Sequence, residues 1–250
     1  MKKIGFLILA LCAGSTYAQT IISDRPTKTN SSTVIPISSL QVETGASVAF
    51  TPNGTKANSR IIAPTSLFRY GVSDFFEIRM LTQFESFKAP LDLNRTSGIA
   101  DFQFGTKIRL LDNDEETTKV AWIGHMSIPT GSRGISSELY SGISSLAISH
   151  VLAENINFSY NLGFNYYPTK NGDITYSAAL GVAVNDKVSF FIEPYGQYTR
   201  LQTYEASFDA GLTYLLKSNV QMDFSYGSGL NHKMNFLSIG FSWNTAKKVD

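Results

Sequence analysis

Hydrophobic and polar residues alternate with a period of two along most of the chain beyond residue 40. The clearest example is INFSYNLGFNY (residues 156–166), in which the even positions are hydrophobic and the odd positions are Asn, Ser or Gly. Successive side chains of a strand point to opposite sides, so this pattern predicts β-strands with one apolar and one polar face. A helix would mix the two sets of residues.

Twelve such runs follow one another. They are expected at residues 40–50, 60–71, 75–86, 98–110, 117–128, 139–152, 155–167, 173–184, 187–199, 203–216, 219–228 and 233–243. Most reach the roughly 9–11 residues that a tilted strand needs to cross a membrane. Short turns alternate with longer polar loops, as in outer-membrane barrels. The pattern predicts an all-β fold, a transmembrane antiparallel up-and-down β-barrel of about 12 strands.

A soluble β-sandwich is the alternative fold, because its strands also alternate. Three features favour the barrel: charges in mid-strand on the polar face, aromatic residues near strand ends, and strands longer than the usual roughly 5–6 residues. In a barrel the polar face lines the lumen. The candidate lumen-lining residues are Glu43, Glu77, Arg79, Asp101, Lys107, Arg109, Glu193, Asp209 and Asp223.

These charges allow two interpretations. Buried charges need partners, so they could simply fill the interior as ion pairs. Alternatively they line a polar constriction that sets selectivity. Bulky candidates (Phe191, Tyr195, Leu215) would argue for a filled lumen, whereas small ones (Gly45, Gly105, Ala179, Gly181, Gly211) would argue for space.

The N-terminus has the charged, hydrophobic and small-residue regions of a secretory signal peptide. We therefore assign residues 1–18 to a signal peptide that is cut after Ala18. Cys12 raises lipoprotein processing as an alternative, but Leu11 precedes it where such signals have a small residue. Cleavage after Ala18 would leave a mature chain without cysteine.

A polar segment, residues 19–39, separates this signal from the predicted barrel at 40–243, and residues 244–250 form a C-terminal tail. The polar segment 19–39 could extend into the periplasm or fold into the lumen as a plug. The plug hypothesis is favoured because an Asp24-Arg25 pair and many hydroxyl groups suit a polar lumen. Proline would keep the segment extended rather than helical. The plug candidates are Asp24, Arg25, Pro26 and Pro36.

The charge balance of 21 basic and 20 acidic residues predicts no nucleic-acid partner. An enzyme would need a nucleophile and a base. His125 and Ser127, with Glu138 beyond them, are similar to the His-x-Ser and distal Glu of outer-membrane lipid A deacylases, so a lipid hydrolase is the remote alternative. The histidines lack metal-ligand spacing. We therefore expect no enzymatic activity, no metal and no cofactor.

The opening DRPTKTNSSTVIPISSLQVETG resembles the start of the outer-membrane family named for the meta-pathway of phenol degradation. The matching positions are Asp24, Arg25, Pro26, Pro36, Gln41, Glu43 and Gly45, and further matches are FRYGVSDFFEIR, GIADFQFGTKIRLL, SIPTGS and NLGFNY. The resemblance runs over most of the chain. It implies a barrel that passes small aromatic or hydrophobic compounds, without an assigned substrate or catalytic residue.

The predicted function is a channel or transporter for small solutes in the bacterial outer membrane. The alternative is a closed barrel with a structural or loop-binding role and no transport. The expected partners are outer-membrane lipid, the barrel-assembly machinery, which would read the last strand ending in Trp243, and an unidentified small-molecule solute.

Overall fold

The computed structural model describes residues 21–53, 56–89, 94–112, 117–168 and 170–246. The predicted signal peptide lies outside these residues. Among them is no helix that is long and apolar enough to cross a membrane. The strands are β1 (Leu40–Asn53), β2 (Lys56–Ser73), β3 (Phe76–Lys88), β4 (Thr96–Ile99), β5 (Phe102–Asp112), β6 (Thr118–Ile128), β7 (Ser141–Ala153), β8 (Ile156–Tyr167), β9 (Lys170–Ala183), β10 (Val188–Thr199), β11 (Thr203–Lys217), β12 (Val220–Gly229) and β13 (Asn235–Asn244).

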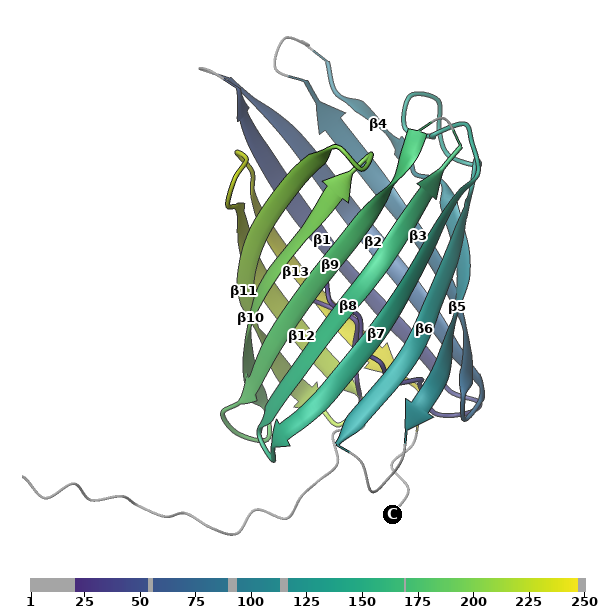
Figure 1. Cartoon of the computed structure of the whole chain (residues 1–250), viewed down its shortest axis with the longest axis vertical. Helices are drawn as coiled ribbons and strands as arrows, with labels where there is room; N and C mark the ends of the chain where they lie inside the picture. Colours follow the sequence, from purple (N-terminus) through teal and green to yellow (C-terminus); the bar gives the residue numbers. More distant parts are fainter. Residues whose placement is uncertain (1–20, 54–55, 90–93, 113–116, 169, 247–250) are drawn as a thin grey trace, which may run out of the picture.

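The strands form one closed antiparallel barrel (Figure 1). Each pairs with its neighbours in sequence, and β1 closes the ring by pairing with β13 as well as β2. Both β4 and β5 lie along β3, with Phe84 opposite Ile99 and Leu81 opposite Gln103. They are therefore two pieces of one wall strand. The prediction of an antiparallel barrel of 12 strands is confirmed, because each of the other strands corresponds to one predicted run.

Two interruptions of the predicted alternation stand out, and further register shifts lie near strand ends. The run expected at 98–110 is interrupted between Ile99 and Phe102, where the chain leaves the ladder. In β2 the pairing slips on both sides around Pro64, between Ile62 and Thr65 on the β3 side. Proline has no N–H to donate to a ladder, so a strand can contain it only where the pairing is disrupted.

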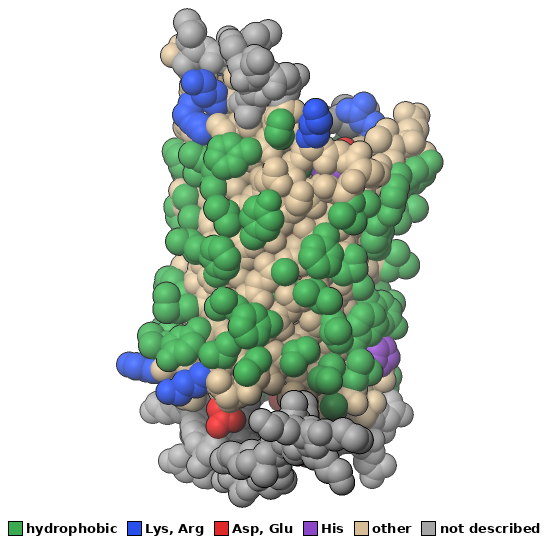
Figure 2. Space-filling model, turned by 90° about the vertical axis from the view of Figure 1, so that its left-hand side faces the viewer, with side chains coloured by type: hydrophobic (Ala, Val, Ile, Leu, Met, Phe, Trp, Pro, Cys, Tyr) green, Lys and Arg blue, Asp and Glu red, His purple; other side chains and the backbone are tan. Residues whose placement is uncertain are grey.

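Hydrophobic side chains lie outside and polar side chains lie inside, which is the reverse of the arrangement in a soluble protein. Large hydrophobic side chains cover the outside at mid-height, and on the face in view Lys and Arg lie toward the two ends (Figure 2). Exposed hydrophobic residues include Phe84, Phe104, Met126, Leu162, Phe190, Phe224 and Ile239. The largest fully buried side chains are mostly charged or amide residues. A sandwich would bury its apolar face, so the β-sandwich alternative is wrong.

Residues 21–39, which precede β1, run inside the barrel (Figure 1). We call residues 21–39 the N-terminal segment. It has no regular strand and touches the ladder through a single bridge from Ile37 to Gly71. Asp24 pairs with Arg79 on β3, and the backbone N–H of Thr29 donates to Glu193 on β10, on the opposite side of the ring. The segment therefore crosses the lumen before the chain enters the wall at Leu40.

Candidate functional site: the barrel lumen

An ion network fills one side of the lumen. Its members come from β1, β2, β3, β5 and the N-terminal segment, and they are Asp24, Glu43, Arg69, Glu77, Arg79 and Lys107. The guanidinium of Arg69 lies at its centre, with Nε 2.8 Å from Glu77 Oε1 and Nη1 2.9 Å from Glu43 Oε1. All six residues are buried. The three cations and three carboxylates balance, so the network buries charge without leaving an unpaired ion.

Asp24 attaches the N-terminal segment to this network. Its carboxylate lies 2.7 Å from Arg79 Nη2, 3.1 Å from Lys107 Nζ and 3.8 Å from Arg69 Nη1. Burial alone would raise the pKa of Asp24, but the positive charges of Arg69, Lys107 and Arg79 outweigh it and hold that pKa far below its ordinary value. The carboxylate therefore stays ionised, and the segment is held to the β2, β3 and β5 side of the wall.

Charged side chains of the wall also satisfy the backbone of the segment. Glu43 Oε2 accepts from the backbone N–H groups of Asp24 at 2.9 Å and Arg25 at 3.2 Å. Glu77 Oε2 accepts from the N–H of Ile35 at 2.9 Å. A segment without secondary structure needs such partners when it is buried. The carboxylates of Glu43 and Glu77 thus bind both the segment and the cations of the wall.

Arg25 spans the seam where the first and last strands meet. Its guanidinium donates to both oxygens of Asp223, from Nε at 3.2 Å and Nη2 at 3.0 Å, and to Ser238 at 3.1 Å. It lies against Gly45 of β1 and Gly240 of β13, which are directly opposite each other. A Cβ on Gly45 would come within 2.5 Å of the guanidinium, and one on Gly240 within 2.4 Å. The two glycines leave the space that Arg25 occupies.

Glu193 holds the turn of the segment. Its two carboxylate oxygens accept from the backbone N–H groups of Lys28 at 2.7 Å and Thr29 at 2.6 Å. Asp209 lies opposite Glu193 in the β10–β11 register. The ammonium of Lys28 lies 4.8 Å from the ring centre of Phe236. Burial lowers the pKa of Lys28, although the negative charges of Asp209 and Glu193 act in the opposite direction.

The segment meets the β7 and β9 part of the wall only through neutral groups among the described side chains. Thr29 Oγ1 donates to Ser177 Oγ at 2.8 Å, and the hydroxyl groups of Ser32 and Ser149 are hydrogen-bonded. We call these two interactions the hydroxyl contacts. A neutral hydrogen bond contributes about 0.5–1.5 kcal/mol net, whereas removing one partner of a buried ion pair costs about 3–5 kcal/mol. The segment is therefore held by ion pairs on the β2, β3 and β5 side and only by neutral hydrogen bonds at β7 and β9, while Glu193 on β10 binds its backbone.

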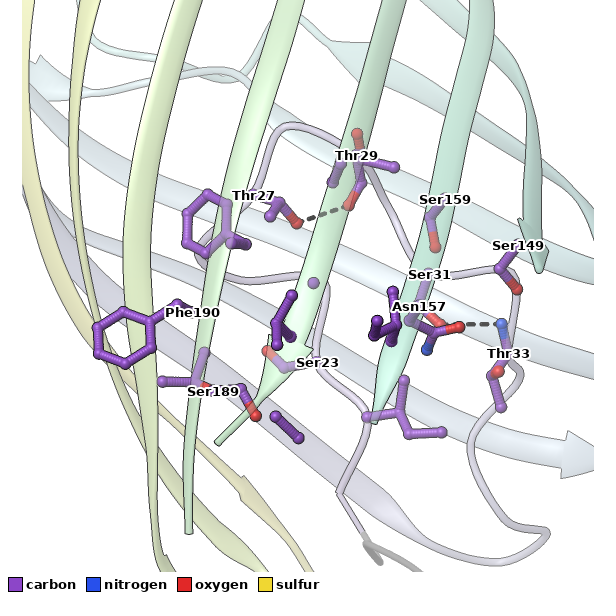
Figure 3. Close-up of a pocket in the computed structure, with 18 of the residues that line it drawn as sticks. Ser23, Thr27, Thr29, Ser31, Thr33, Ser149, Asn157, Ser159, Ser189 and Phe190 are labelled. Atoms are coloured by element: carbon purple, nitrogen blue, oxygen red, sulfur yellow. Dashed lines mark hydrogen bonds between the residues drawn. The ribbon is translucent and has the colours of Figure 1, made fainter. Parts of the chain in front are cut away.

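Two cavities lie along the β7–β11 part of the wall. The turn-side cavity, of about 570 Å³, opens among the segment and strands β7–β11. Figure 3 shows Thr27 and Thr29 of the segment across it from Asn157 and Ser189. The loop-side cavity has a volume of about 330 Å³. Its lining includes Lys28, Ile143, Asn161, Tyr176, Tyr195 and Met234. Asn30 lines both cavities, so the segment is what separates them.

The structure does not bring all the predicted lumen-lining residues together. Asp101 lies at the break between β4 and β5, where its carboxylate accepts from Gly131, Ser136 and Ser137 of the β6–β7 loop. Arg109 is one-third exposed and pairs with Asp112 at 3.1 Å. Neither joins the ion network. Glu193, Asp209 and Asp223 are buried on the opposite side of the lumen. The plug candidate Pro26 lines the turn-side cavity, and Pro36 lies beside Gly71, close to the start of β1.

Small residues do not simply mark empty space. Ala179 and Gly181 line the turn-side cavity, and a Cβ on Gly181 would meet nothing closer than 3.9 Å. By contrast, Gly45 lies beneath Arg25, and a Cβ on Gly105 would contact His125 and one on Gly211 would contact Phe191. Of the bulky candidates, Phe191 and Tyr195 border cavities, whereas Leu215 borders neither. The size of a side chain has to be judged together with what packs over it.

The three residues of the hydrolase alternative do not assemble. His125 Nε2 accepts a hydrogen bond from Arg79 Nε at 2.9 Å, so this nitrogen is unavailable to take a proton from Ser127. Glu138 is exposed in the loop after β6. In the part of the chain described here, no group of three or more His, Cys, Asp or Glu residues could hold a metal ion.

Sequence reasoning missed several residues of the lumen. Arg69 was not a candidate, although it lies one position before the outward-facing Tyr70, and the period of two places it on the lumen face. Lys28 was missed because nothing in an irregular segment reveals which way a side chain points. Asn161 and Ser177 lie on the polar faces of predicted strands, but no pattern separates them from other polar residues. Their roles depend on where the segment crosses the barrel.

Solved structures with a similar fold are outer-membrane barrels. The COG4313 outer membrane channel from Pseudomonas putida F1 is similar with a TM-score of 0.67 and 11% identity, over 85% of this chain and 97% of that chain. The KdgM porin has a TM-score of 0.55 and 8% identity over 81% and 98%. The NanC porin has a TM-score of 0.54 and 10% identity over 80% and 98%. At these identities the likeness establishes the fold.

A comparison of the sequence with curated proteins finds no match. A family model described as "Putative MetA-pathway of phenol degradation" matches residues 23–243. This range begins in the N-terminal segment and ends in β13, so it includes both the wall and the chain inside it. The resemblance noted in the sequence is confirmed, and the protein belongs to this family of outer-membrane β-barrels.

Proposed function

We propose that this barrel is a channel for small solutes, in which the N-terminal segment closes the path. The observation that carries the proposal is the pair of cavities that meet at Asn30. They lie along the β7–β11 part of the wall, one toward the short turns and one toward the longer loops. Joining them would create a passage through the lumen without disturbing the wall.

The difference in attachment determines which side opens. On the β1–β5 side the segment is held by Asp24 in the ion network, and at the seam by Arg25. For the segment to leave β7 and β9, the hydroxyl contacts and the hydrogen bonds from the backbone N–H groups of Lys28 and Thr29 to Glu193 on β10 have to break. The hydroxyl contacts together contribute about 1–3 kcal/mol and each bond to the carboxylate about 1.5–3 kcal/mol, and none of these contacts is a buried ion pair. The segment therefore acts as a gate that moves away from β7 and β9 and stays anchored on the other side.

A disulfide lock tests this gate. The variant carries Thr29→Cys and Ser177→Cys, whose hydroxyl oxygens are 2.8 Å apart. The matched control carries Ser23→Cys and Ser242→Cys, at 2.7 Å on the anchored side. Cys12 is the only native cysteine, within the predicted signal peptide. Single-channel conductance in planar bilayers and solute uptake by liposomes would be measured oxidised and reduced.

Oxidation of the first pair should abolish conductance and reduction should restore it, whereas the control pair should conduct equally in both states. Equal conductance of the first pair when oxidised and reduced would show that the path lies elsewhere. If the folded wild type shows neither conductance nor uptake, the barrel is closed and the structural role remains.

The route to the membrane is also part of the proposal. Residues 1–18 would direct export and be cut after Ala18, and the barrel-assembly machinery would read β13, in which Leu237, Ile239, Phe241 and Trp243 alternate outward toward lipid. The apolar outer surface supports lipid as the surrounding solvent. The mass of the protein purified from outer membranes tests the cleavage site, since a mature chain that does not begin at Gln19 would refute it.

A further inference from the structure

The loop-side cavity contains a polar group that the protein itself leaves unused. Asn161 projects from β8 into this cavity and is 7% exposed. Neither its Oδ1 nor its Nδ2 has a hydrogen-bond partner among the described residues. A buried amide without partners is costly, and native proteins almost always satisfy such groups. The cavity is therefore built to receive a molecule that can both donate and accept a hydrogen bond.

The charged groups around this cavity already have partners. The ammonium of Lys28 lies over the Phe236 ring, and Glu205 Oε2 accepts from Gln197 Nε2 at 2.8 Å. His232 Nδ1 lies 3.2 Å from Asn231 Oδ1. The negative charges of Asp209 and Glu193 already act on Lys28, so an anion would have to compete with them, and any charged ligand would lose its hydration on entry. The available polar chemistry is neutral.

The rest of the lining is suited to a compact apolar body. Ile143, Met234 and the ring of Tyr195 face the cavity. Apolar walls with a few convergent polar groups are typical of small-molecule sites, and about 330 Å³ is at the small end of their range. A molecule of one ring with one polar group would place its ring against these side chains and its polar group at Asn161.

We propose that the loop-side cavity is a binding site for neutral, single-ring solutes that carry one hydroxyl or carboxamide group, with Asn161 as the residue that recognises this group. The inference rests on the proposed channel function and names its solute class. Among the described residues that line the cavity, Asn161 is the one with a buried amide whose oxygen and nitrogen both lack a partner. Binding at this site precedes movement of the segment, so it can be measured without transport.

Calorimetry on the detergent-solubilised full-length mature protein tests the site. The probes are benzyl alcohol and benzamide, compared with toluene, benzoate and benzylammonium, which keep the ring and change only the polar group. Cyclohexylmethanol shows whether the ring must be aromatic. The variant is Asn161→Leu, which keeps the size and removes the amide. The control is Asn157→Leu, four residues away on the same strand and the same face, in the turn-side cavity.

Benzyl alcohol and benzamide should bind the wild type at least about tenfold more tightly than the other three benzene derivatives, since one or two net hydrogen bonds correspond to that factor. Asn161→Leu should lose this preference and bind toluene as well as benzyl alcohol, and Asn157→Leu should retain it. Equal loss in both variants, no preference in the wild type, or tighter binding of either ion would overturn the assignment. Binding with this selectivity in a barrel that does not conduct would refute the proposed channel function but would still support the proposed binding site.

Discussion

Asp24→Asn is the sharpest test of how the segment is held, because it removes one charge and almost no volume. The wild-type network has three cations facing three carboxylates, and the variant leaves Arg69, Arg79 and Lys107 with only two. Removing one member of a buried ion pair costs about 3–5 kcal/mol. The asparagine can still accept from the N–H of Ser31, which Asp24 does at 2.8 Å. We therefore use the lower end, about 3 kcal/mol.

This loss of free energy weakens the docking of the segment, because the hydrogen bonds between the wall strands are unchanged. At about 1.4 kcal/mol per factor of ten, docking should weaken at least about a hundredfold. The assay is open probability in planar bilayers, with folding of each variant checked by its heat-dependent migration in gels. Asp101→Asn is the control, because its carboxylate binds the β6–β7 loop and not the segment. Unchanged open probability in Asp24→Asn, or an equal increase in Asp101→Asn, would refute the reasoning.

The pH dependence of this effect follows from the depressed pKa of Asp24. A carboxyl group with a lowered folded-state pKa contributes stability that is fully present above its ordinary pKa of 3.8 and is lost only as the pH falls through the lower folded value. The difference in open probability between wild type and Asp24→Asn should therefore stay constant from pH 7 down to about pH 5. A difference that disappears within this range would mean that Asp24 takes up a proton there.

Two further predictions concern the seam and the turn-side cavity. Arg25→Ala leaves the fully buried Asp223 carboxylate unpaired and should lower the stability of the folded barrel by about 3–5 kcal/mol. Arg25→Lys should lose less stability because it keeps the charge. Equal melting temperatures of wild type and Arg25→Ala in gels would contradict this. Gly181→Leu should reduce conductance without loss of heat stability, because a Cβ there has open space, while Gly211→Ala should lower heat stability, because its Cβ would meet the Phe224 carbonyl oxygen at 2.2 Å. Similar stability of these two variants would show that glycine packing is not what distinguishes them.

The wall of this protein can be predicted from its sequence alone. Alternation such as that of residues 156–166 is a local property, because a strand exposes one face to lipid and the other to the lumen whatever its neighbours are. Eleven of the twelve predicted runs correspond to single strands, and the twelfth is β4 and β5 together. The inward direction of Glu77 and Lys107 follows from the same rule, as does that of Arg69, which we overlooked.

The contents of the lumen depend on contacts between residues that are distant in the sequence. The contacts of Asp24 with Lys107 and of Thr29 with Ser177 join residues far apart in the sequence, through a segment with no periodicity to read. The break before Asp101 likewise depends on its hydrogen bonds to the β6–β7 loop. The period of two predicts which face of the wall a side chain lies on. Closure of the ring determines which side chains meet across the lumen. The asymmetric attachment of the segment, and the unpaired amide of Asn161, arise from that closure.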